Sequence, residues 1–352
     1  MTELTDLLTQ LISASGLSGY EGPIREIIQQ TWQPLTTELK VSRIGSLHGL
    51  KTGTGPEPRP SILLSAHMDA IGLMVSAVNA GFLHLVAIGG IDHRVLPGQL
   101  VTVHGRKDLP GVIVQPPARL LPEEANSGPV DLEYLLVDTG LSPREVERQV
   151  RPGDLVSFAQ EPLELGEDVI SGHSLDNRAS VAAVTECLRL LQERNHSWDV
   201  WVVASVQEEE TLGGALTSAF EIRPSLAVAI DVTFGKSPGA NDYKTFPMGK
   251  GPTLGLGPNI HPRLHRQFKE LADQLEIPYA VEVMPHHSGT DAYALQIAAE
   301  GIPTMVVSIP LRYMHTPVEM IMLKDIQRAG RLLAEFITHL TLETMASFTW
   351  DD

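Results

Sequence analysis

The segment Ser-Ile-Leu-Leu-Ser-Ala-His-Met-Asp, residues 61–69, decides the fold. Its first six residues form a short apolar run, which is typical of a β-strand buried on both faces of a sheet. The run ends at His67, and Asp69 follows two residues later. Imidazole and carboxylate groups both bind metal ions. We therefore predict a buried strand that presents metal-binding side chains at its carboxyl end.

Three more apolar runs, at residues 201–206, 226–230 and 304–309, predict further buried strands. Two amphipathic helices are predicted within the first 35 residues. Helical spacing of apolar residues predicts four more helices, over residues 176–193, 262–276, 290–300 and 323–342. This alternation predicts an α/β fold with a mostly parallel sheet flanked by helices on both faces.

A different pattern occupies the region between the first strand and residue 165. Short β-branched or alternating runs, separated by glycine and proline, predict strands at residues 82–86, 100–104, 112–114, 135–137 and 155–158. Ser142, Pro143 and Glu145 form a capping box that begins one helix. We expect an inserted small β-barrel domain over residues 70–165, between two parts of a catalytic domain, 1–69 and 166–352.

Composition limits the partners of the chain. Its 352 residues suggest about two domains, and 43 acidic against 26 basic residues give a net charge of −17. This charge repels nucleic acids and anionic membranes. Only one cysteine is present, and no apolar stretch reaches the roughly 18 residues of a membrane span. The first residues lack the basic segment of a secretory signal, so we expect a cytoplasmic protein with no nucleic-acid or membrane partner.

Metal-binding residues follow each predicted buried strand. In open α/β sheets, ligands bind beyond the carboxyl ends of the strands. Two histidines and three carboxylates exceed the three protein ligands of a usual catalytic zinc site and suit two divalent ions, zinc, cobalt or manganese. The candidates at these strand ends, together with Asp176 in a turn before a predicted helix, are His67, Asp69, Asp176, Glu208, Glu209, Asp231 and His315.

The position of each candidate suggests its role. Asp176, central and on a turn, would bridge the two ions. Asp69 could hold the second ring nitrogen of His67. Glu208 and Glu209, if extended, point in opposite directions, so one could bind a metal while the other acts as general base on water whose pKa the ions lower.

Seven motifs in order resemble the tetrahedral (TET) aminopeptidases, the glutamyl-aminopeptidase-like metallopeptidase family forty-two. The resemblance covers nearly the whole chain and implies an aminopeptidase that acts on peptides, with an inserted dimerisation barrel and assembly of dimers into a dodecamer. It also implies that one metal binds His67 and Asp231, that the other binds Glu209 and His315, and that Asp176 bridges them; Glu208 would be the base and Asp69 the orienting acid. The motifs lie at residues 67–72, 175–178, 206–209, 231–233, 249–252, 289–292 and 312–319.

Two stretches depart from the family pattern. Ala70 stands where the family usually has glutamate, and residues 208–215 read Glu-Glu-Glu-Thr-Leu-Gly-Gly-Ala, without the usual arginine. No inferred ligand is lost. These departures bear on substrate preference, on the tuning of the metals and on subunit contacts.

Simpler roles remain for several residues. Asp176 could cap a helix, Glu210 could belong to a solvated turn, and Cys187 has the spacing of a core residue. His286 and His287 could line a substrate pocket or stabilise a turn.

Three alternative functions compete with the aminopeptidase. The first is a metal-dependent deacylase or amidohydrolase acting on N-acyl amino acids. The second is a non-catalytic assembly protein of the same fold. The third is a glycoside hydrolase, which would work without metal and keep its activity in a chelator.

Overall fold

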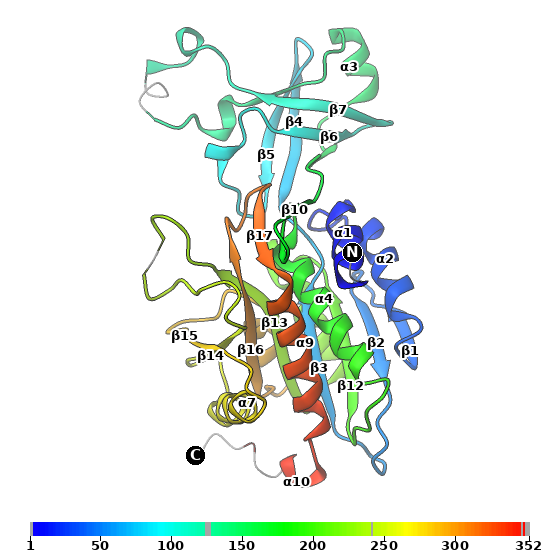
Figure 1. Ribbon diagram of the computed structural model, residues 1–352. Helices are drawn as coiled ribbons and strands as arrows, with labels where there is room; N and C mark the ends of the chain where they lie inside the picture. Colours follow the sequence, from blue (N-terminus) through cyan, green and yellow to red (C-terminus); the bar gives the residue numbers. More distant parts are fainter. Residues whose placement is uncertain (1–2, 124–127, 241, 346–347, 349–352) are drawn as a thin grey trace.

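The computed structural model describes residues 3–123, 128–240, 242–345 and 348. Within these residues, eleven strands form one sheet and six form a closed barrel. Each has its own core of buried apolar side chains. In Figure 1 the barrel stands above the sheet, at one end of the molecule. The predicted α/β sheet with a small β-barrel is confirmed.

Four parallel strands form the centre of the sheet. They are adjacent in the order β12, β3, β13 and β16. All four strands predicted from apolar runs are present, although β13 and β16 continue further than expected. Because they run in the same direction, their carboxyl ends meet at one edge. Their bounds are β12 (Asp199–Ser205), β3 (Ser61–His67), β13 (Leu226–Phe234) and β16 (Thr304–Arg312).

Shorter strands extend the sheet on both sides, and most of them pair antiparallel to their neighbours. They have three to five residues each, too few for a clear periodic signal. We did not predict strands β10, β11, β14, β15 and β17. The bounds are β1 (Glu38–Val41), β2 (Leu47–Lys51), β10 (Leu163–Leu165), β11 (Val169–Gly172), β14 (Thr253–Leu256), β15 (Ala280–Val283) and β17 (Glu319–Met322).

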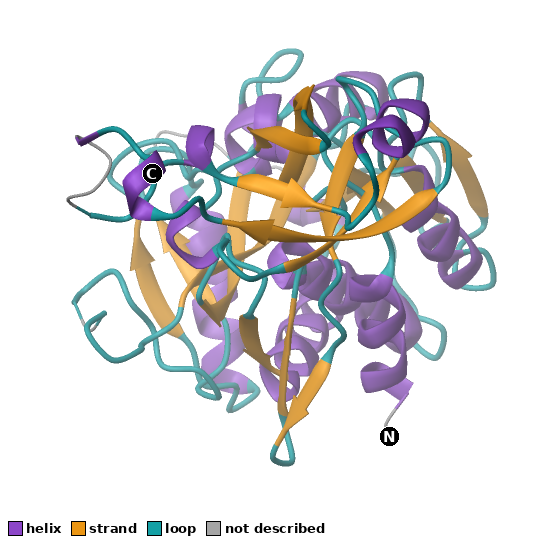
Figure 2. Ribbon diagram, turned by 90° about the horizontal axis from the view of Figure 1, so that it is seen from above, coloured by secondary structure: helices purple, strands orange, loops and turns teal. Residues whose placement is uncertain are grey.

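Helices flank the sheet, as Figure 2 shows from above. One group, α4 and α9, packs together against β13 and β16, and another, α6 and α8, packs together against β3. Cys187 on α4 is buried in this core, as predicted. The bounds are α1 (Glu3–Ser13), α2 (Gly22–Trp32), α4 (Leu175–Leu190), α6 (Gly213–Ile222), α7 (Pro262–Gln274), α8 (Asp291–Gln296), α9 (Leu323–Thr338) and α10 (Leu342–Met345).

Two predicted helices are shorter than expected. The helix expected over 290–300 ends at Gln296, and the chain cannot continue it because Ala299 has a φ of +51°, in the left-handed region. The helix expected over 323–342 ends at Thr338 and is followed by the separate short helix α10.

The barrel closes in the order β4, β5, β8, β7, β6 and β9. Helix α3 begins with the predicted capping box of Ser142 and Glu145. No helix among the described residues is long and apolar enough to cross a membrane. The bounds are β4 (Gly72–Asn79), β5 (Phe82–Ile88), β6 (Leu100–His104), β7 (Asp108–Val114), β8 (Leu136–Asp138), β9 (Leu155–Phe158), α3 (Pro143–Gln149) and the 3₁₀ turns His93–Val95, Ala118–Leu120 and Leu132–Tyr134.

Candidate functional site

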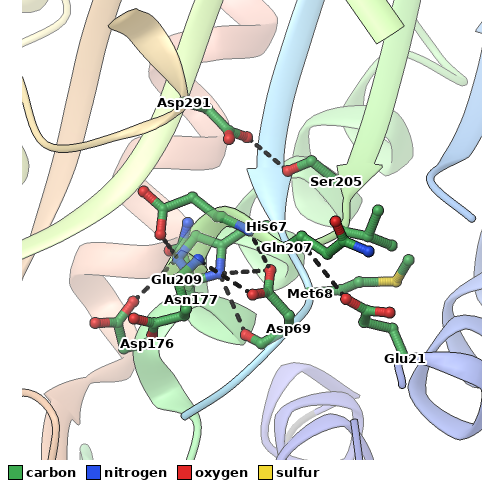
Figure 3. Close-up of polar contacts among 12 residues, drawn as sticks. Glu21, His67, Met68, Asp69, Asp176, Asn177, Ser205, Gln207, Glu209 and Asp291 are labelled. Atoms are coloured by element: carbon green, nitrogen blue, oxygen red, sulfur yellow. Dashed lines mark hydrogen bonds and ion pairs between the residues drawn. The ribbon is translucent and has the colours of Figure 1, made fainter. Parts of the chain in front are cut away.

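The carboxyl edge of the central strands brings all seven candidate residues together. His67 ends β3, Asp231 lies on β13, and His315 lies between β16 and β17. Six of the seven line a cavity of about 690 Å³, and Asp69 lies fully buried behind them. Figure 3 shows four of the seven around a common point: His67, Asp69, Asp176 and Glu209.

Asp176 lies between two imidazole rings. Its Oδ1 is 3.2 Å from Nε2 of His67, and its Oδ2 is 3.4 Å from Nε2 of His315. Asp176 belongs to the first turn of α4 but has non-helical backbone angles, and the peptide bond to Asn177 is cis. The residue is therefore not a simple helix cap, because each carboxylate oxygen faces a different histidine.

Glu208 and Glu209 begin a short helix, α5 (Glu208–Thr211). The extended backbone on which their predicted opposite directions depended is therefore absent. They nevertheless approach different histidines: a carboxylate oxygen of Glu208 is 3.7 Å from Nε2 of His67, and one of Glu209 is 3.7 Å from Nε2 of His315. The turn fixes both side chains at the centre of the site.

Asp69 orients two parts of the site. Its Oδ1 lies 3.5 Å from Nδ1 of His67, whose closer partner is the backbone carbonyl of Asp69 at 3.2 Å. The carboxylate also accepts hydrogen bonds from the backbone N–H groups of Glu208, at 3.0 Å, and Glu209, at 3.2 Å. One buried acid thus contacts both the histidine ring and the first turn of α5.

Two groups of side chains have geometry suited to a cation. One consists of His67, Glu208 and Asp231, and the other of His67, Asp176 and Glu209. In each group, the potential ligand atoms lie within 4.8 Å of one another. His315 borders the second group and is the most exposed member of the site, with 39% of its side chain accessible.

Negative charge crowds this region. Burial, together with neighbouring carboxylates, raises the pKa values of Glu208, Glu209 and Asp231 well above their usual range. For His67, burial lowers the pKa, but the charge of Glu208 and the hydrogen bond to Asp176 outweigh it, so the net shift is upward. The carboxylates therefore need positive charge beside them.

Divalent cations fit this requirement. The oxygen and imidazole donors are those of zinc, cobalt and manganese sites. Carboxylates that are protonated without metal would lose their protons to solvent when such ions bind. The buried cation Arg178 contacts backbone carbonyls, including that of Met68, and not the cavity acids. The residues present thus suit bound divalent metal ions.

Sequence reasoning assigned no role to Glu319, although it lay in a quoted motif. This buried carboxylate accepts hydrogen bonds from the backbone N–H groups of Asp176, at 3.1 Å, and His315, at 3.0 Å. It therefore holds two of the candidate ligands in their turns. The available signal was an acid four residues after His315, at the start of a strand.

Asp291 was also given no role. It is buried beside the site, and its Oδ2 accepts hydrogen bonds of 2.6 Å from the hydroxyl groups of Ser65 and Ser205. Figure 3 shows the contact with Ser205. Ser65 lies two residues before the end of β3, and Ser205 is the last residue of β12. Of the two histidines considered for the substrate pocket, His287 lines the cavity. Glu210, considered for a solvated turn, accepts a hydrogen bond from the backbone N–H of Gly89 near the barrel.

The turns that carry the candidate residues are strained. Ser174, Gln207 and His315 all have φ between 57° and 63°, in the left-handed region that non-glycine residues avoid. Such residues cost of order 1–3 kcal/mol each and concentrate at functional sites.

A family comparison identifies the chain. Residues 45–332 match the model of the M42 glutamyl aminopeptidases. The chain belongs to this family. It is therefore a peptidase, as the sequence motifs implied. The matched region includes every candidate residue.

Relatives of this peptidase agree with the assignment. A lysyl aminopeptidase of Pyrococcus furiosus is 36% identical over 95% of this chain and 97% of its own. A TET aminopeptidase from a marine sediment thaumarchaeote has a similar structure, with a TM-score of 0.93, 30% identity and coverage of 99% of both chains. The TET1 peptidase of Pyrococcus horikoshii, described as assembling into a tetrahedron or a large octahedral shell, has a TM-score of 0.83 at 30% identity, covering 96% of this chain and 100% of its own.

Glu319→Gln tests whether the buried carboxylate positions the site. The amide can accept one of the two backbone N–H groups but presents its own NH₂ toward the other, so Asp176 or His315 should shift. We expect divalent-metal affinity to fall about 10- to 100-fold, as measured by calorimetric titration. The exposed Glu300→Gln serves as control, and unchanged affinity in Glu319→Gln would show that this residue does not position the ligands.

Proposed function

We propose that this M42 peptidase is an aminopeptidase that uses two divalent ions, zinc, cobalt or manganese. His67 and Asp231 would hold one ion, Glu209 and His315 the other, and Asp176 would bridge them. The observation that carries this proposal is the placement of Asp176, whose two carboxylate oxygens each face a different histidine at 3.2 and 3.4 Å.

Bound ions would polarise the scissile carbonyl and lower the pKa of water. The protein's own side chains supply the remaining chemistry. Glu208 lines the cavity and is nine-tenths buried, so it can take a proton from the attacking water and pass it to the leaving amine.

Glu208 has a competing role, because it also lies within ligand distance of His67 and Asp231. Asp69 holds the backbone of both glutamates, so a change confined to the Glu208 side chain should leave Glu209 in place. A substitution at Glu208 therefore separates a general base from a metal ligand.

Glu208→Gln should retain both metals while kcat falls about 10²- to 10⁴-fold, because the amide cannot accept the proton. Metal content is measured by elemental analysis and kcat with an aminoacyl p-nitroanilide. The neighbouring Glu210→Gln, outside the cavity, is the matched control. Loss of one metal would make Glu208 a ligand, and retained activity would remove it from the mechanism.

Asp176→Asn should lower the affinity for both ions, because one carboxylate faces both histidines. We expect metal content after dialysis to drop well below that of the wild type, with the exposed Asp242→Asn unaffected. Elemental analysis supplies the measurement. A variant that stays fully loaded would contradict the bridging role.

We further propose that the chain forms a homo-oligomer, with the barrel, residues 70–165, as its dimer contact. The assembly described for the Pyrococcus horikoshii TET1 peptidase supports this proposal. Light scattering should give the mass of a dodecamer of the 38.3-kDa chain. A monomeric mass at micromolar concentration would overturn the proposed assembly without affecting the proposed chemistry.

A further inference from the structure

One carboxylate in the cavity takes no part in the proposed reaction. Glu282 on β15 lines the same cavity as the candidate metal ligands. Its Oε1 accepts a hydrogen bond of 2.7 Å from Oγ1 of Thr233, and its Oε2 accepts one of 2.6 Å from Oγ1 of Thr253. No lysine, arginine or histidine among the described residues pairs with it.

The register of the strands locates this carboxylate. Asp231 pairs with Ser308 on β16, and Ser308 pairs with Thr253 on β14, so the three form one row across the sheet. Thr233 lies two residues beyond Asp231 on the same face. Because Glu282 reaches both threonines, its carboxylate lies over β16, between β13 and β14. Neighbouring strands are about 4.8 Å apart, which places this group roughly 5 to 10 Å from Asp231.

Glu282 has no cationic partner among the described residues. Burial raises its pKa, and the hydrogen bonds from Thr253 and Thr233 oppose this shift only in part. The buried hydroxyl of Ser308 lies close enough to influence the carboxylate but makes no hydrogen bond of normal geometry. A partly buried carboxylate without a counter-ion is costly, so a cation from outside the chain would stabilise this arrangement.

Several of the residues that line this cavity are apolar. They would cover the stem of a long side chain while its charged end reaches the carboxylate, as lysine and arginine stems do at protein surfaces. Three of them are Leu212, Met284 and Met314.

We propose that Glu282 is a specificity-determining residue that selects peptides with a lysine or arginine at the N-terminus. The cationic end of that side chain would pair with the Glu282 carboxylate, while the scissile bond lies at the metal ligands. This inference rests on the proposed aminopeptidase function, because it assigns the first residue of the peptide to this end of the cavity.

Lysyl and norleucyl p-nitroanilides provide the test, because norleucine has the same straight four-carbon stem without the charge. The metal-loaded wild type should show a higher kcat/KM for the lysyl substrate. In Glu282→Gln the ratio of the two kcat/KM values should fall at least about 30-fold, since the amide leaves the ammonium unpaired. Glu147→Gln, an exposed change on the barrel helix, should keep the wild-type ratio.

Two further measurements guard against a variant that folds poorly. Glu282→Lys should raise kcat/KM for glutamyl relative to norleucyl p-nitroanilide, because the charge of the pocket is reversed. Free L-lysine should inhibit the wild type at least about tenfold more strongly than L-norleucine, and this comparison needs no variant.

The outcomes separate the two proposals. A wild type that cleaves the norleucyl substrate as well as the lysyl one overturns the role of Glu282 but leaves the aminopeptidase in place. Equal losses for both substrates in Glu282→Gln would make Glu282 structural or a contact for the α-amine, and would also overturn the selection. Hydrolysis of neither substrate, with cleavage of N-acyl amino acids instead, would overturn the proposed function itself.

Discussion

The repulsion among buried carboxylates is the constraint on which the site depends. Asp176, Glu208, Glu209 and Asp231 meet around two histidines at one edge of the sheet. Without cations, burial and this crowding raise the pKa values of Glu208, Glu209 and Asp231 well above their usual range. A chain that brings such groups together must recover the free energy elsewhere, and divalent ions are the natural source.

The backbone holds this arrangement in place. Asp69 accepts the N–H groups that open α5, and Glu319 accepts those of Asp176 and His315. Three left-handed residues, Ser174, Gln207 and His315, lie in or beside the same turns. The packed core of parallel strands offsets this strain. The turns can therefore hold the candidate ligand side chains in fixed orientations. Asp69 and Glu319 thus govern the geometry of the candidate metal ligands.

The cavity has two polar ends and several apolar lining residues. At one end lie the candidate metal ligands, and at the other Glu282 is held by Thr233 and Thr253 from two different strands. The row formed by Asp231, Ser308 and Thr253 follows from the pairing of β13 with β16 and of β16 with β14. The residues of the proposed reaction and of the proposed selection therefore lie on one sheet, and separate substitutions can test them.

The sequence by itself determined the central strands, the barrel and the seven candidate residues, because apolar runs ending in histidine or acid are local signals. Residues 61–69 already contained the strand and two of these side chains. Only the tertiary structure decided the geometry of Glu208 and Glu209, the roles of Glu319 and Asp291, and the position of Glu282. These depend on contacts between residues far apart in sequence and on turns with unusual φ, which no local pattern encodes. Short edge strands such as β15 were missed for the same reason: pairing with neighbours, and not periodicity, makes them strands.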